Sequence, residues 1–207
     1  MDEGKSKILI IGATGRLGRH IAKASAVAGH PTFLLIRPDT LANPGPEKAA
    51  LLGDLKNLGT TTLEGSLVDK SSLLIALKQV DVVISAVAHA DQQFLLIEAI
   101  KEAGNIKRFY PAEYGTDFDR ATSLPPLAPL MVKIQIRRAI EAAGIPYTIV
   151  ANFVFASLFL GHFWHVEYEA PPRHKVEFYG DGERRVPFVF EEDIAEYIIE
   201  SVDDIAH

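Results

Sequence analysis

The first residues with recognisable chemistry are the glycines of a short loop, Gly12, Gly15 and Gly18, spaced G-x-x-G-x-x-G. The loop follows the apolar run Ile8–Ile11 and precedes a segment with helical periodicity. Glycine lets the backbone approach a pyrophosphate closely, and the helix N-terminus offers it free N–H groups. This context favours a dinucleotide site over the alternative, an ordinary strand-to-helix turn. We predict that the whole loop binds the cofactor through Gly12, Ala13, Thr14, Gly15, Arg16, Leu17 and Gly18.

A second signal distinguishes between the two nicotinamide dinucleotides. Arg37 follows the apolar segment Thr32–Ile36, at the position where an acidic residue would select NAD and an arginine would bind the 2′-phosphate of NADP. The guanidinium fork can donate two parallel hydrogen bonds to that phosphate. Lys48, near the start of the next predicted helix, supplies a second positive charge. The sequence therefore favours NADP(H), and the alternative is that both residues are solvated surface cations.

Lys133 is the residue on which acid–base chemistry is predicted to depend. It lies near the start of the predicted helix Pro129–Ala143, at the edge of an apolar stripe. The stripe consists of Val132, Ile136, Ala139, Ile140 and Ala143. The helix dipole and partial burial both disfavour an ammonium there, so the lysine would have a lowered pKa and serve as general acid or base. Judged from the residues alone, the alternative is a lysine whose stem packs on the stripe while its ammonium reaches water.

Several common chemistries lack the residues that they need. No tyrosine is followed four positions later by lysine, which excludes the proton-transfer pair of the classical short-chain dehydrogenases. No G-x-S-x-G elbow is present, and the absence of cysteine excludes disulfides and thiolate catalysis. His162 and His165 share an aromatic segment without carboxylate or cysteine partners, so we predict no metal site.

Composition limits the class of protein. A chain of 207 residues with 48% hydrophobic residues can form one sizeable domain with a small appendage. The formal net charge of −6 argues against general binding to nucleic acid. The polar start of the sequence and the absence of a long apolar run predict neither a secretory leader nor a membrane partner. We therefore expect a cytoplasmic protein.

The elements that must position these residues alternate along the first 151 residues. The predicted strands are Lys7–Ile11, Thr32–Ile36, Thr61–Glu64, Val82–Ala86, Lys107–Tyr110 and Tyr147–Ala151. The predicted helices are Arg16–Ala28, Pro46–Leu58, Lys70–Lys78, Gln92–Ala103 and Pro129–Ala143. The stretch Pro38–Pro46 is predicted to be a proline-rich loop. This alternation predicts the α/β fold class, with a Rossmann-type, doubly wound parallel sheet.

The rhythm changes after Ala151. We predict an NAD(P)-binding Rossmann domain over residues 1–151 and a partial substrate-binding region over 152–207. Within the second region we expect a β pair formed by Lys175–Tyr179 and Arg184–Phe190, then a last helix over 191–203 that packs on the Rossmann domain. The aromatic segment Phe153–Trp164 is strongly apolar, and its exposed area would favour a homodimer.

Several longer segments carry a resemblance to a known family. They are Gly29–Phe33, Lys78–Ala86, Ile100–Phe109, Ile136–Ala142, Gly144–Thr148 and Pro171–Arg173. With these segments the chain resembles the plant isoflavone reductase-like proteins, which belong to the NmrA-like atypical short-chain dehydrogenase/reductases. That group includes the phenylcoumaran benzylic ether, pinoresinol–lariciresinol and isoflavone reductases and the phenylpropene synthases. The resemblance covers nearly the whole chain.

The resemblance implies an NADPH-dependent reductase that acts on a small phenylpropanoid-derived aromatic substrate, such as a phenylcoumaran, lignan, isoflavone or coniferyl ester. The family's catalytic lysine lies four residues before an Arg-Arg pair, which places that role on Lys133. There it would move a proton at a substrate phenol while NADPH delivers hydride to a benzylic or quinone-methide-like carbon. The resemblance also implies that further residues line the cofactor: Ser85, Ala86, Val87, Ala112, Glu113, and Asn152 or Phe153.

The chain departs from the family pattern near the predicted nicotinamide position. Ala112 stands where the family has serine, and the asparagine that follows Tyr147-Thr148 is displaced by one position. Members of the family also run further, which predicts a truncated substrate-binding appendage here. These departures support a second hypothesis, in which the protein is an NmrA-like NADP(H)-binding module or sensor with little or no catalysis.

Overall fold

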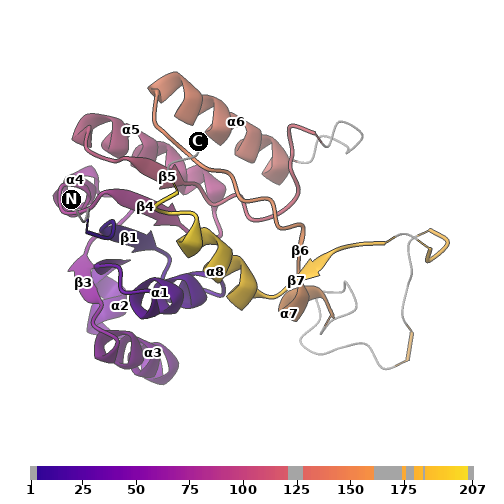
Figure 1. Cartoon of the computed structure of the whole chain (residues 1–207), viewed down its shortest axis with the longest axis horizontal. Helices are drawn as coiled ribbons and strands as arrows, with labels where there is room; N and C mark the ends of the chain where they lie inside the picture. Colours follow the sequence, from indigo (N-terminus) through magenta and orange to yellow (C-terminus); the bar gives the residue numbers. More distant parts are fainter. Residues whose placement is uncertain (1–3, 121–127, 161–173, 176–179, 184, 205–207) are drawn as a thin grey trace.

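The structure is a computed structural model, and it describes residues 4–120, 128–160, 174–175, 180–183 and 185–204 (Figure 1). Five strands form its central sheet: β1 (Ile8–Ile11), β2 (Thr32–Ile36), β3 (Thr61–Glu64), β4 (Val82–Ser85) and β5 (Arg108–Tyr110). They are all parallel and lie in the order β3-β2-β1-β4-β5, so the winding direction reverses between β1 and β4. The predicted doubly wound parallel sheet is therefore confirmed.

The prediction of a sixth strand over Tyr147–Ala151 is wrong. Within the described residues this segment forms only one isolated parallel bridge, between Phe109 and Tyr147. The Phe109 N–H donates to the Pro146 carbonyl, and the Thr148 N–H donates to the Phe109 carbonyl. The next bond of a parallel ladder would need an N–H from residue 111, and Pro111 has none. The pairing therefore stops after one bridge.

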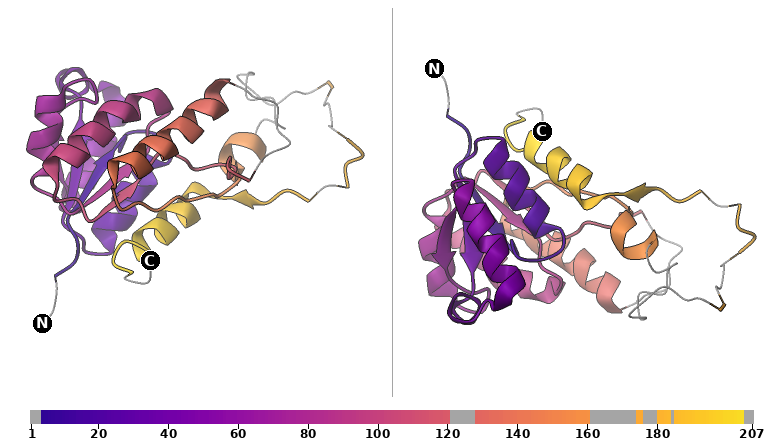
Figure 2. Two further views of the ribbon diagram at one scale, coloured as in Figure 1. Left: turned by 90° about the horizontal axis from the view of Figure 1, so that it is seen from above. Right: turned by 90° about the horizontal axis from the view of Figure 1, so that it is seen from below.

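Helices cover both faces of the sheet, which makes three layers (Figures 1 and 2). One face carries α4 (Lys70–Leu77), α5 (Gln93–Ala103) and α6 (Ala128–Ala143), and the other carries α1 (Gly18–Val27), α3 (Gly45–Asn57) and α8 (Glu191–Glu200). Side chains of β1 alternate between the two interfaces, as successive residues of a strand must. Leu9 and Ile11 enter the first, whereas Ile8 and Ile10 enter the second. Both faces of β1 are thus apolar, as its continuous apolar run predicted.

Two short helices before residue 143 were not predicted. One is α2 (Pro38–Ala42), which lies inside the segment predicted as a proline-rich loop. Pro38 stands in the first turn of this helix, where its missing N–H costs nothing and its fixed φ suits the helix, and Asp39 adds a favourable negative charge. The other is the 3-10 turn η1 (Ala90–Gln92). The predicted helices up to residue 143 otherwise agree with the structure to within about two residues at each end.

The segment after residue 151 contains β6 (Val154–Phe155), α7 (Ala156–Phe159) and β7 (Phe188–Val189). β7 pairs in parallel with β6. The predicted strand Arg184–Phe190 is too long, because only Phe188–Val189 of its described residues is a strand, and its pairing with β6 was not predicted. Most of Lys175–Tyr179 lies outside the described residues, as does the end of Phe153–Trp164, so the pairing between the two predicted strands and the apolar surface stay predictions. Among the described residues, no helix is long and apolar enough to cross a membrane.

The last helix, α8, packs on α1 in one shared apolar cluster that includes Ile21, Ile194 and Ile198. Its C-terminal end is bound to the sheet, because the Arg108 guanidinium of β5 donates to the carbonyls of Ser201 and Asp204. The helix itself ends at Glu200, three residues before the predicted end. The division of the chain at residue 151 remains a prediction.

Candidate functional site

A cavity of about 720 Å³ lies at the carboxyl ends of the strands, next to the point where the strand order reverses. Ligands of doubly wound proteins bind at this position, because the loops after adjacent strands diverge there. The walls come from the loops that follow β1 to β5 and from α6. Of the predicted site residues, the cavity is lined by Gly12, Ala13, Thr14, Gly15, Arg16, Leu17, Arg37, Ala86, Val87, Ala112, Glu113 and Lys133.

The glycine loop has a backbone geometry that side chains would destroy. Gly12 has a φ of +87°, and a Cβ on it would lie 2.7 Å from the Ala86 carbonyl oxygen. A Cβ on Gly18 would overlap the Gly12 carbonyl oxygen. The Gly15 N–H donates to that same carbonyl at 2.9 Å, which closes the turn. The loop therefore packs tightly against the end of β4 and presents its backbone to the cavity.

Arg37 directly follows β2 and lines the cavity beside Asp39 and Thr40. Its side chain is exposed, and within the described part of the chain no carboxylate forms an ion pair with it. A solvated guanidinium at this place is available to an anion that enters the cavity. Lys48 is exposed on α3 and does not line the cavity. The structure thus brings Arg37, but not Lys48, to the cavity wall.

The predicted residues at the end of β4 have different surroundings. Ala86 and Val87 line the cavity, and the Ala86 N–H donates to the Ile11 carbonyl at 2.8 Å. Ser85 is fully buried, and its hydroxyl has no hydrogen-bond partner among the described residues. Ser85 therefore lies behind the wall that Ala86 and Val87 form.

Asn152 and Phe153 do not line the cavity. Asn152 is buried, and neither atom of its amide has a hydrogen-bond partner in the described part of the structure. Phe153 has a φ of +61°, an unfavourable conformation for an aromatic residue, and its N–H donates to the Gly115 carbonyl at 3.1 Å. This segment contributes Phe155 to the cavity instead, a residue that was not predicted to belong to the site.

Lys133 extends from α6 into the same cavity. Ile136 and Ile140 of the predicted stripe are fully buried in the core, which fixes the helix that carries Lys133. The Lys133 ammonium donates to the Glu113 carbonyl and lies 5.4 Å from the centre of the Phe118 ring. Burial lowers the pKa of Lys133, the charge of Glu113 opposes that effect, and the charge of Arg137 adds to it.

Sequence reasoning missed the ion pairs around Lys133. Arg137, one turn later on α6, is 6% exposed in its side chain and pairs with Glu113, which is 3% exposed. Asp117 and Asp119 bind the same guanidinium. Tyr114 also lines the cavity, and burial raises the pKa of its phenol. The four-residue spacing from Lys133 to Arg137 was a signal for a shared helix face, but the partners lie in a distant loop.

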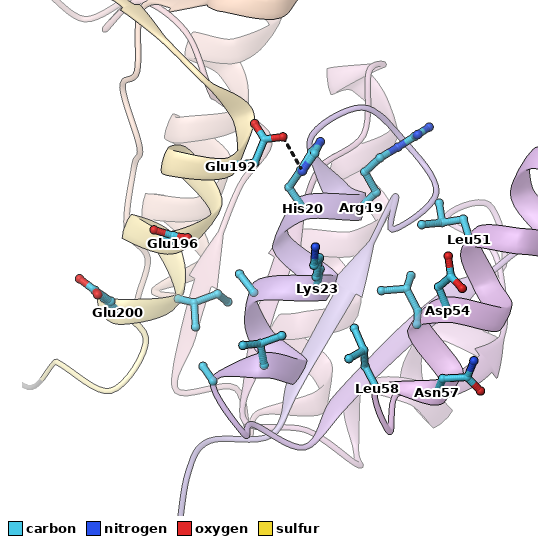
Figure 3. Close-up of a pocket in the computed structure, with 15 residues that line it drawn as sticks. Arg19, His20, Lys23, Leu51, Asp54, Asn57, Leu58, Glu192, Glu196 and Glu200 are labelled. Carbon is cyan, nitrogen blue, oxygen red and sulfur yellow. Dashed lines mark ion pairs between the residues drawn. The ribbon is translucent and has the colours of Figure 1, made fainter.

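A second cavity, of about 740 Å³, lies between α1, α3 and α8 (Figure 3). It is lined by Arg19 and Lys23 from α1 and by Glu196 from α8. The buried Leu55 and Ile199 line it as well. His20 pairs with Glu192 at 3.4 Å across its edge. It holds none of the predicted site residues. The predicted site residues that line either of these two cavities therefore all line the first one.

The sheet order, the glycine loop and the cavity at the strand ends define a Rossmann-type, doubly wound α/β protein. The NmrA-like family matches residues 4–207, and the chain belongs to that family. The chain is 52% identical over 204 residues to a phenylcoumaran benzylic ether reductase of Ginkgo biloba, a match that covers 97% of this chain and 66% of that protein. The chain thus spans about two thirds of the length of that relative.

Solved structures agree with this assignment. The complex of AtPrR2 with NADP⁺ and (+)-pinoresinol superposes with a TM-score of 0.86 at 41% identity, covering 97% of this chain and 67% of that one. The complex of Vitis vinifera leucoanthocyanidin reductase with NADPH superposes with a TM-score of 0.85 at 32% identity, covering 96% and 65% respectively. The resemblance drawn from the sequence segments is confirmed.

Proposed function

We propose that the protein is an NADPH-dependent reductase that transfers hydride to a phenylpropanoid-derived aromatic substrate, with Lys133 as the general acid and base. The observation that carries this proposal is the position of Lys133, whose ammonium lines the same cavity as the glycine loop and Arg37. The relatives support the same reading, because one is a phenylcoumaran benzylic ether reductase and a structural neighbour is a complex with NADP⁺ and pinoresinol.

The cavity suits NADP(H) in two respects. Gly12 and Gly18 have no room for a Cβ, so the backbone of the loop and the start of α1 would form a cradle for a pyrophosphate. Arg37 carries an exposed positive charge at the end of β2, where a 2′-phosphate would lie. Bound there, the cofactor would supply the hydride. The exposed Lys48 stays a predicted second contact to the phosphate.

Lys133 would transfer the proton of the substrate phenol. Its lowered pKa increases the fraction of neutral amine at physiological pH, and the neutral amine can accept the proton of a substrate phenol. Loss of that proton helps to expel the benzylic oxygen and leaves an electrophilic carbon that accepts hydride. The ammonium can then return the proton to the oxygen that leaves. The Glu113 carbonyl and the Phe118 ring hold the Lys133 ammonium in place for both transfers.

The remaining expectations also belong to this proposal. Phenylcoumarans, lignans, isoflavones and coniferyl esters are the candidate substrates. The cytoplasm is the expected location, nucleic acid is not an expected partner, and a homodimer is one candidate assembly. Ser85, Asn152 and Phe153 keep their predicted proximity to the cofactor as a hypothesis, because they lie behind or beside the cavity wall.

The proposal is tested by NADPH oxidation with that substrate panel. The wild-type chain should reduce at least one member, and Lys133→Met should lower turnover about a hundredfold to ten-thousandfold, the range for loss of one general acid–base group. Binding of NADPH to the variant, measured by calorimetry, should stay within about threefold of wild type. If NADPH binds and no panel member is reduced, the reductase assignment fails. The second hypothesis, an NADP(H)-binding module or sensor with little or no catalysis, would then be favoured.

A further inference from the structure

The loop that follows β5 touches Lys133 at two separate points. We refer to residues Glu113 to Asp119 as the 113–119 loop. At its start, the Glu113 carbonyl accepts a hydrogen bond from the Lys133 ammonium. Near its end, the Phe118 ring lies 5.4 Å from the same ammonium, within the range of a cation–π contact. The loop therefore wraps around the amine.

A single guanidinium holds both ends of the 113–119 loop. Arg137 Nη2 donates to Glu113 Oε2 at 2.9 Å, while Arg137 Nη1 donates to Asp117 Oδ1 at 2.8 Å and to Asp119 Oδ2 at 3.1 Å. Asp117 and Asp119 flank Phe118, so the second set of bonds fixes the backbone on both sides of that ring. Arginine can do this because its planar fork presents several donors in fixed directions.

We propose that Arg137 is a positioning residue for Lys133: by clamping both ends of the 113–119 loop, it holds the Glu113 carbonyl and the Phe118 ring against the Lys133 amine. The inference deepens the proposed function and rests on it. Arg137 acts through the loop, and it does not line the cavity itself.

The ion pair with Arg137 also directs the Glu113 carboxylate. One carboxylate oxygen of the buried Glu113 pairs with Arg137, whereas the Lys133 ammonium donates its hydrogen bond to the carbonyl of Glu113. Burial alone would lower the pKa of Arg137, but its hydrogen bonds to Glu113 and Asp117 outweigh burial and raise the pKa above its ordinary range. The clamp therefore stays charged throughout the pH range in which Lys133 titrates.

Removal of Arg137 should release Glu113 to pair with Lys133. A paired ammonium holds its proton more firmly, so the titration of Lys133 would move to higher pH. A lysine at position 137 keeps the charge but is a point donor, and it cannot reach Glu113, Asp117 and Asp119 together. Arg138 also donates to Asp119, at 2.6 Å, so the Arg137→Lys variant should loosen the far end of the loop at Asp117. It should keep the titration of Lys133 near wild type and make the amine more accessible.

The test is competitive acetylation of Lys133 with acetic anhydride over a pH series, read by mass spectrometry on the full chain without cofactor or substrate. The labelling curve gives both a titration midpoint and a limiting rate. Arg137→Gln should raise the midpoint by at least about one pH unit, a tenfold change in proton affinity. Arg137→Lys should leave the midpoint within about half a unit and raise the limiting rate several-fold. Glu102→Gln on α5 is the control, because it breaks an exposed ion pair with Lys70 that involves no residue of the 113–119 loop, and it should change neither quantity.

A midpoint and limiting rate equal to wild type in Arg137→Gln would overturn the proposal. If circular dichroism shows that Arg137→Gln does not fold, an unchanged limiting rate in Arg137→Lys overturns it instead. The pH profile of kcat/KM gives the second readout, and its acid limb should shift upward in Arg137→Gln. Because the labelling needs no turnover, failure of the reductase assignment and failure of the clamp are separate results.

Discussion

The glycine loop and the surroundings of Lys133 line one cavity, but they are built over very different sequence distances. The loop's geometry is decided by seven consecutive residues and by the carbonyl of Ala86 against which they pack. The environment of Lys133 needs α6, the 113–119 loop and three acidic side chains that converge on Arg137. A local site can be recognised from a motif, whereas a site built from distant segments becomes visible only once the chain has folded.

The largest effect is expected at the glycine loop, the site built from consecutive residues. Gly18→Ala places a Cβ on the Gly12 carbonyl oxygen, and backbone on both sides prevents relief. We expect the free energy of unfolding to fall by about 3 kcal/mol and NADPH binding to disappear. Gly53→Ala in α3 is the matched control, because a Cβ there meets nothing within 4 Å and should stabilise the helix by up to about 1 kcal/mol. Chemical denaturation measures both, and equal stability of the two variants would contradict the prediction.

The next effect concerns the charged edge of the same site. Arg37→Ala should weaken NADPH binding about tenfold to a hundredfold, the value of hydrogen bonds to a charged group, and should leave NADH binding nearly unchanged. Parallel calorimetric titrations with the two cofactors provide the measurement. An equal loss of affinity for NADPH and NADH would show that Arg37 does not contact the 2′-phosphate.

A smaller effect is expected near Lys133, at the site built from distant segments. The hydrogen bond from Arg137 lowers the pKa of Asp117 below its ordinary value. A lowered folded-state pKa gives stability that is present above the unfolded-state pKa of about 4 and is lost as pH falls through the folded-state pKa. Urea unfolding from pH 2 to 7 should therefore show Asp117→Asn less stable than wild type at neutral pH, with the gap closing in acid. The exposed Asp54→Asn should show no such gap, and a gap of constant size would mean that ionisation of Asp117 is not its source.

The smallest effect is expected at Lys48. Because this residue is exposed and outside the cavity wall, Lys48→Ala should weaken NADPH binding no more than about fivefold, the upper limit for an exposed charge pair. A loss as large as that of Arg37→Ala would show that α3 moves toward the phosphate when cofactor binds. The ratio of the two losses, measured in one titration series, separates these cases.

The sequence allowed most of the sheet to be predicted, since continuous apolar runs and alternating helices are local patterns. The prediction of a strand over Tyr147–Ala151 is wrong because Pro111, far from this segment in the sequence, ends the hydrogen-bond ladder that the strand would have joined. The prediction of a loop that begins at Pro38 is wrong for a different reason: proline is well suited to the first turn of a helix, and here it starts α2. Lys133 was found from the edge of its apolar stripe, but Arg137 was not recognised, because its partners lie in a loop about twenty residues away.

The packing of α8 on α1 has a consequence for how the protein is made. Ile21 of α1 is fully buried, yet part of its cover comes from Ile194 and Ile198, which the ribosome adds more than 170 residues later. A nascent chain that has emerged only as far as residue 151 already contains every strand of the central sheet, but the layer of α1 and α3 on one of its faces still lacks α8. During synthesis the apolar surface that α8 covers stays exposed to water until α8 has been made. Chaperone binding or self-association can compete with folding during this interval.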